Sequence, residues 1–127
     1  MALTVSGLTV FAVRLLSSEA PEVIGAWRGE SVCVTDAVAC RNETVVYYIS
    51  NSPDGPDRVV IRADKIVDGK AITMGTGPWE YDHAQQTLKW SSPRQVWLLK
   101  ITGKRIEGTL TLADQTVFRK VGLEKVQ

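Results

Sequence analysis

The sequence has little of the material from which catalytic and metal centres are usually built. Its 127 residues include one histidine, His83, and two cysteines, Cys33 and Cys40. Two cysteines with no neighbouring histidine do not supply the four ligands of a zinc site, so we expect no metal. Gly-x-Ser-x-Gly, His-Glu-x-x-His and glycine-rich phosphate-binding motifs are absent as well. We therefore expect neither an enzyme nor a cofactor.

An excess of charge of one sign is also lacking. Fifteen Lys and Arg residues face fourteen Asp and Glu residues, for a net charge of +1. Nucleic-acid-binding proteins normally show a marked basic excess, so we expect no nucleic-acid partner. The apolar run from Ala2 to Val13 is too short for a stable membrane span. With 44% hydrophobic and 23% charged residues, the composition is that of one ordinary globular domain.

Residues 1–21 form an apolar leader ahead of a domain of residues 22–127, and two interpretations of this leader stand. Its length and the small-x-small triplet Ser18-Glu19-Ala20 suit a degenerate secretory signal. The absence of a basic residue before the run, and Arg14 at its end, favour a segment that packs on the domain instead. If the leader is retained, it would be able to join two copies of the chain into a homodimer.

Cys33 and Cys40 are separated by six residues. A disulfide across this short loop is the favoured interpretation, with two buried free thiols as the alternative. A disulfide would indicate a secreted or periplasmic protein, because disulfides persist in oxidising compartments.

From residue 22 onward, short β-type segments alternate with turn residues, and no segment has the pattern of an amphipathic helix. Asp68-Gly69 is the strongest hairpin signal, and Gly75 and Gly77 mark a bulge or bend within a strand. Connections this short require antiparallel neighbours, so we predict an all-β, eight-stranded up-and-down barrel, with a sandwich as the alternative. The predicted strands cover residues 23–34, 44–49, 58–67, 70–82, 87–90, 95–101, 105–112 and 115–121.

Alternation along these strands places three of the four tryptophans, Trp79, Trp90 and Trp97, inside the barrel. The interior of an eight-stranded barrel is either filled by side chains or holds one small ligand, and both possibilities stay open. If there is a pocket, a small hydrophobic or aromatic molecule would suit it. The candidate ligand-binding residues are Tyr47, Trp79, Tyr81, Trp90 and Trp97.

Two short motifs at opposite ends of the domain carry a family resemblance. Gly25-Ala26-Trp27 opens the first strand and Val117-Phe118-Arg119 lies on the last, which resembles the calycin group of lipocalins, fatty-acid-binding proteins and avidins. In that group an arginine from the last strand packs on the tryptophan of the first. The resemblance implies a structural pair of Trp27 and Arg119, held by a cation–π contact.

Residues 23–122 as a whole resemble small exported bacterial proteins with lipocalin-like domains of uncharacterised function. The stretches Asn42–Tyr47 and Ala63–Lys70 contribute to this resemblance. It implies an extracytoplasmic barrel and carries no activity. The calycin resemblance, together with the inward aromatic residues, implies a protein that binds a small ligand. The alternative is a protein-interaction module such as a secreted protease inhibitor. Bacterial metalloprotease inhibitors are small eight-stranded barrels with a Gly-x-Trp motif and one disulfide, although the cysteine spacing is far tighter here.

Overall fold

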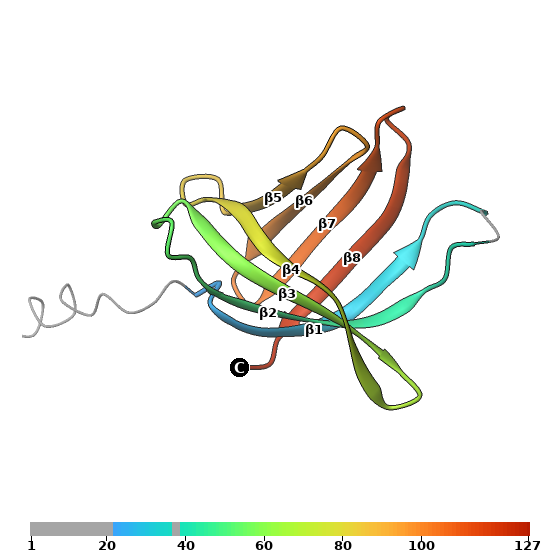
Figure 1. The fold of residues 1–127 in the computed structure, drawn as a ribbon, viewed down its shortest axis with the longest axis horizontal. Helices are drawn as coiled ribbons and strands as arrows, with labels where there is room; N and C mark the ends of the chain where they lie inside the picture. The colour runs from blue at the N-terminus through green and yellow to red at the C-terminus, as the bar shows by residue number, and fades with distance from the viewer. Residues whose placement is uncertain (1–21, 37–38) are drawn as a thin grey trace, which may run out of the picture.

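The computed structural model describes residues 22–36 and 39–127 of the chain. Eight antiparallel strands follow one another in chain order and close into a barrel, which confirms the predicted all-β up-and-down architecture (Figure 1). The predictions for residues 1–21, namely the leader and the homodimer formed through it, lie outside the described residues. The strands are β1 (Gly25–Cys33), β2 (Glu43–Asn51), β3 (Arg58–Val67), β4 (Lys70–Asp82), β5 (Thr87–Ser91), β6 (Gln95–Thr102), β7 (Arg105–Leu112) and β8 (Val117–Lys125).

The connection between β3 and β4 is the predicted two-residue hairpin. Asp68 and Gly69 both have positive φ angles, 51° and 79°, as a type I′ turn requires. At the other end of the domain, β8 begins two residues later than predicted and continues to Lys125. The late start follows from Gln115, whose φ of 73° belongs to the preceding turn and not to a strand.

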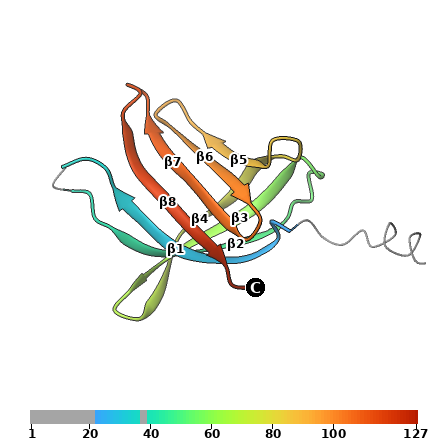
Figure 2. The same cartoon turned by 180° about the vertical axis from the view of Figure 1, so that it is seen from behind.

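β4 is the longest strand, and its two edges differ. Along β3 it pairs from Lys70 to Glu80, with a register shift where Met74 is the extra residue next to Gly75, so the predicted bulge is confirmed. Along β5 it pairs only through Glu80–Asp82. Among the described strands, the segment Lys70–Trp79 therefore has β3 as its sole partner, and we call its other side the β4 free edge. The hairpin that carries this edge projects from the barrel in both views (Figures 1 and 2).

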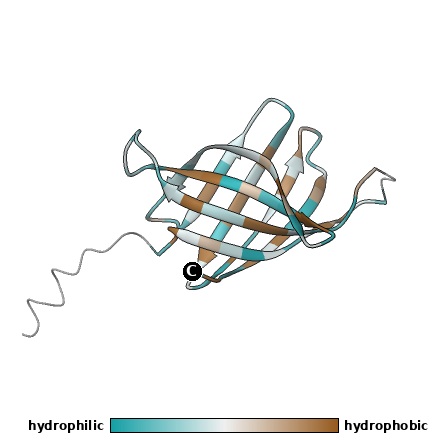
Figure 3. Ribbon diagram, turned by 60° about the horizontal axis from the view of Figure 1, so that its bottom comes forward, coloured by the Kyte–Doolittle hydropathy of each residue, from teal (hydrophilic) through white to brown (hydrophobic). Residues whose placement is uncertain are grey.

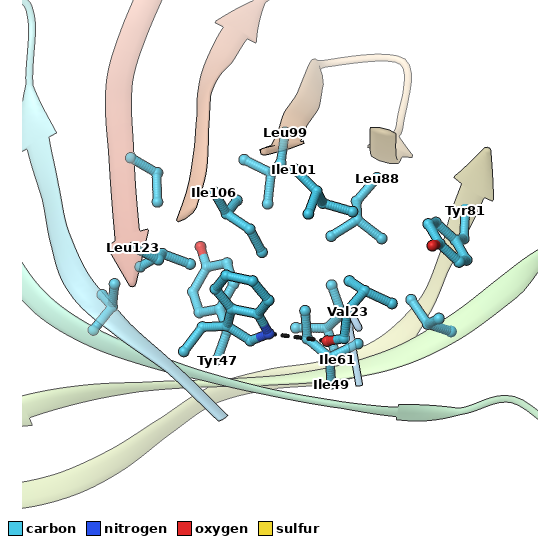
Figure 4. Packing of buried hydrophobic residues seen from close by; sticks show 14 residues of the cluster. Val23, Tyr47, Ile49, Ile61, Tyr81, Leu88, Leu99, Ile101, Ile106 and Leu123 are labelled. Atoms are coloured by element: carbon cyan, nitrogen blue, oxygen red, sulfur yellow. Dashed lines mark hydrogen bonds between the residues drawn. The ribbon is translucent and has the colours of Figure 1, made fainter. Parts of the chain in front are cut away.

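Apolar and polar residues alternate along the strands, as the colouring of Figure 3 shows. The apolar side chains that face inward fill one end of the barrel, which we call the packed end (Figure 4). Trp27 is fully buried there, and its Nε1 donates a hydrogen bond of 2.9 Å to the carbonyl of Val23. The main members of the packed end are Val23, Trp27, Ile49, Val59, Tyr81, Leu88, Leu99, Ile101, Ile106 and Leu123.

The predicted pair of Trp27 and Arg119 needs correction. The β1–β8 register places Lys125 opposite Trp27, with its Nζ 5.7 Å from the ring centroid. Arg119 lies opposite Cys33, six residues further along β1, which corresponds to about 20 Å of strand. A cation from the last strand does lie over the tryptophan of the first, but it is a lysine near the end of β8.

Candidate functional site

A cavity of about 420 Å³ occupies the rest of the barrel interior. In β1, β2, β6 and β8, the lining residues lie in the half of each strand further from the packed end. They are Ser31, Glu43, Val45, Tyr47, Gln95, Trp97 and Arg119. The interior is thus neither wholly filled nor wholly hollow. Apolar side chains seal one end, and the other end holds a space of the size that small-molecule sites usually have.

Three indoles form the aromatic wall of the cavity. Trp90 of β5 and Trp97 of β6 are direct partners across the ladder, and Trp79 of β4 faces Trp97 with 6.4 Å between ring centroids. The two rings are tilted by 50°, a geometry that favours contact between aromatic edges and faces. All three side chains are partly buried, so their rings are available to a molecule in the cavity.

The rim of the cavity includes part of the β4 free edge. Met74, Gly75, Thr76 and Gly77 line the cavity and lie within the segment of β4 that has no partner on its β5 side. A Cβ added at Gly75 or Gly77 would meet no atom within 4 Å. This side of the barrel therefore leaves open space beside the indoles.

Charged groups gather where β1, β2 and β8 meet, at what we call the polar end of the cavity. Arg119 is 13% exposed, and its Nη1 donates to the carbonyl and hydroxyl oxygens of Ser31 at 3.3 and 3.1 Å. Its Nη2 donates to the carbonyl of Arg41 at 2.8 Å, and the guanidinium lies 3.7 Å from the Glu43 carboxylate. Glu43 also lies 3.8 Å from Lys65 Nζ. Both cations thus share the Glu43 carboxylate as their partner.

Tyr47 connects the polar end to the packed end. It is only 3% exposed, and burial together with the nearby Glu43 carboxylate raises the pKa of its phenol to about 12, despite the opposing influence of Arg119. The phenol therefore stays protonated at neutral pH. Within the described residues, its hydroxyl makes no hydrogen bond.

The connection between β1 and β2 is tied by a disulfide between Cys33 and Cys40, as predicted, with 6.1 Å between the Cα atoms. Next to it, Asn42 Oδ1 accepts a hydrogen bond of 2.7 Å from the backbone N–H of Cys33. The same loop supplies the Arg41 carbonyl to Arg119. The disulfide thus fixes the segment that holds the arginine in place.

Of the five predicted ligand-binding residues, the structure brings four together around the cavity: Tyr47, Trp79, Trp90 and Trp97. Tyr81 lies elsewhere. It is buried in the packed end, its ring centroid is 4.2 Å from that of His83, and its hydroxyl accepts a hydrogen bond of 3.2 Å from Gln86 Nε2. Tyr81 shares a face with Trp79 but lies two residues nearer the packed end.

Sequence reasoning missed the polar members of the site. Glu43 shares the inward face of β2 with Val45 and Tyr47, and Arg119 shares the inward face of β8 with Val121. Alternation would have indicated both, but the predicted β2 began at Thr44 and Arg119 was assigned to Trp27. Ser31 gave no signal, because a lone serine in a strand is common.

No metal centre or membrane helix accompanies the cavity in residues 22–36 and 39–127. No group of three metal-ligating side chains occurs there, and no helix long and apolar enough to cross a membrane is found. His83 is exposed, with its Nε2 2.9 Å from the carbonyl oxygen of Pro56.

Fold and site together define an eight-stranded antiparallel β-barrel with an aromatic-lined cavity, an architecture consistent with a calycin-like fold. Comparison with models of known protein families and with curated proteins finds no match for this chain.

Proposed function

We propose that this protein is a lipocalin-like binding protein that holds a small, largely apolar or aromatic molecule in its cavity, without chemical turnover. The observation that carries the proposal is the three-indole wall of Trp79, Trp90 and Trp97 around about 420 Å³ of space. A cavity of this size, mostly apolar with a few polar groups at one end, is the usual form of a small-molecule site.

The affinity expected from burial alone is modest. A bicyclic aromatic molecule is similar in size to an indole and would bury roughly 200 Å². At about 25 cal/mol per Å² this contributes about 5 kcal/mol, from which the cost of association is subtracted. We therefore expect an unoptimised apolar probe to bind weakly, with a dissociation constant on the order of 1 mM or weaker.

The Cys33–Cys40 disulfide supports a place for this protein in an oxidising compartment, as a secreted or periplasmic binding protein. The alternative function, a secreted protease inhibitor, depends on the amino-terminal segment, which lies mostly outside the described residues. No observation favours it.

The proposal is tested by titrating ¹⁵N-labelled protein with 2-isopropenylnaphthalene and following the four indole N–H resonances. We expect the resonances of Trp79, Trp90 and Trp97 to shift in a saturable way, because these rings line the cavity. Trp27 is an internal control, since its N–H is bonded to Val23 in the packed end. Absence of saturable shifts, or equal shifts at Trp27, would contradict binding in the cavity.

A cavity-filling variant makes the test specific. Ala63 lies between Tyr47 and Gly75 in the sheet and lines the cavity, so Ala63→Phe is expected to weaken binding of the probe at least about tenfold by occupying its space. Ala71→Phe is the matched control, because Ala71 is exposed on the same hairpin. Equal binding by the two variants would place the probe outside the cavity.

A further inference from the structure

We infer that the ligand of this cavity is an uncharged molecule that carries a hydrogen-bond acceptor, and that the acceptor receives its hydrogen bond from the hydroxyl of Tyr47. The inference rests on the proposed function and names the chemical class of the ligand. A flat aromatic ketone, aldehyde, ester or amide has the required combination of an apolar body and one acceptor at its end.

The hydroxyl of Tyr47 is unused within the described residues. Every fully buried side-chain nitrogen and oxygen in the described residues has a hydrogen-bond partner. The Tyr47 hydroxyl has no partner there, although the residue is 3% exposed and lines the cavity. Its oxygen must therefore border the open volume of the cavity. A hydroxyl in this position is costly to leave unpaired when an apolar molecule displaces water from it.

The Tyr47 hydroxyl offers a proton to a ligand at neutral pH. Its pKa of about 12 keeps the proton on the phenol throughout the physiological range, so it is a hydrogen-bond donor there. The two ionised groups that influence it, Glu43 and Arg119, are both at the polar end. A ligand that reaches Tyr47 therefore places its own polar atom at that end and leaves its apolar body against the indoles.

The existing contacts of Arg119 and Glu43 disfavour an ionic ligand. Arg119 already donates to Ser31 and Arg41 and faces Glu43, and Glu43 also faces Lys65. An anion would have to compete with Glu43 for both cations, and a cation would have to compete with Arg119 and Lys65 for the carboxylate. A charged ligand would also lose its own hydration on entering the cavity, which costs more than the desolvation of a neutral acceptor.

The experiment compares three naphthalene probes of similar shape. 2-Acetylnaphthalene carries a neutral acceptor, 2-isopropenylnaphthalene replaces the carbonyl oxygen by carbon, and 2-naphthoate is an anion. Dissociation constants are measured by the indole N–H titration for wild-type protein, for Tyr47→Phe and for the matched control Tyr48→Phe. Tyr48 is exposed on the outer face, where the Arg62 guanidinium lies 4.3 Å from its ring centroid.

We expect Tyr47→Phe to weaken binding of the ketone about fivefold, the size of one ordinary hydrogen bond, and to change binding of the alkene by less than about twofold. Tyr48→Phe should change neither. Wild-type protein should bind the naphthoate at least about fivefold more weakly than the ketone. Both tyrosine variants should unfold at temperatures close to that of wild-type protein, since neither loses a hydrogen bond within the described residues.

The outcomes separate this inference from the function on which it rests. If wild-type protein binds the alkene but Tyr47→Phe affects ketone and alkene alike, the contact with Tyr47 is refuted and ligand binding stands. If the naphthoate binds more tightly than the ketone, the uncharged class is refuted. If none of the probes binds to wild-type protein, the proposed function and this inference both fall.

Discussion

At the scale of single residues, Tyr47 shows how burial and a neighbouring charge act together. Both desolvation and the Glu43 carboxylate disfavour the phenolate, so the folded state holds its proton to a pKa of about 12. An unfolded tyrosine has a pKa of about 10. Between these two values the unfolded chain has lost the proton and the folded chain has not, so rising pH favours unfolding.

This difference predicts an alkaline loss of stability that depends on one side chain. Relative to Tyr47→Phe, the free energy of unfolding of wild-type protein should fall by about 1.4 kcal/mol per pH unit between about pH 10 and pH 12, and stay level below pH 10. Urea unfolding of both proteins at pH 8, 10 and 11 measures it. Parallel pH profiles would show that the phenol titrates normally in the folded state.

For single residues, the sequence predicted correctly which side chains face into the barrel, but not how far along the barrel axis each one lies. Alternation placed Trp79 and Tyr81 on one inward face, which is correct, but Trp79 borders the cavity and Tyr81 lies in the packed end. The position of a side chain along the barrel axis depends on the stagger of all eight strands, and the sequence of a single strand does not encode that stagger. The same reason explains the misassigned partner of Trp27, because only the β1–β8 register distinguishes Arg119 from Lys125.

At the scale of elements, the contact between β1 and β8 depends on a glycine. A Cβ added at Gly29 would lie 1.8 Å from the carbonyl oxygen of Gly122, which is part of the backbone and cannot turn away. Gly29 is thus required by the close approach of the two strands that complete the barrel.

Gly29→Ala is therefore expected to lower the free energy of unfolding by about 3 kcal/mol, the upper part of the range for overpacked sites. Gly75→Ala is the matched control on β4, because its Cβ would meet no atom within 4 Å and its backbone has no positive φ. This control should be unchanged or slightly more stable. Chemical denaturation measures both, and a Gly29→Ala protein as stable as the control would contradict the assigned close approach.

The sequence was most informative about the strands and the turns between them. Strands rich in β-branched residues and the Asp68-Gly69 turn predicted the hairpins, because these signals are local. The short ladder between β4 and β5 was not predicted. It results from the length of β4 and the direction of its projecting hairpin, both of which depend on tertiary structure.

At the scale of the whole molecule, the two ends of the barrel should differ in local stability. The packed end buries the apolar cluster, whereas the β4 free edge has one partner strand and mostly exposed side chains. Local opening is easiest where buried apolar contacts are few.

Hydrogen exchange should reveal this gradient. Amides of residues 70–79 that point away from β3 are expected to exchange at least about a hundredfold faster than amides of Leu99 and Ile106, which lie in the packed end. Amides of the same segment that point toward β3 are the matched control, since they share its exposure but have a partner strand. Uniform protection along both edges of β4 would show that the free edge is covered in solution.

The pairing of β1 with β8 has a consequence for how the chain folds. Seven of the eight ladders join neighbouring hairpin strands, but this one brings Trp27 and Lys125 together from nearly opposite ends of the described domain. Contacts between such distant positions carry the largest loop-closure entropy and form more slowly than hairpin contacts. During synthesis, β1 has to wait with one edge unpaired until β8 has been made. Closure of the barrel is therefore the natural last and slowest step of folding.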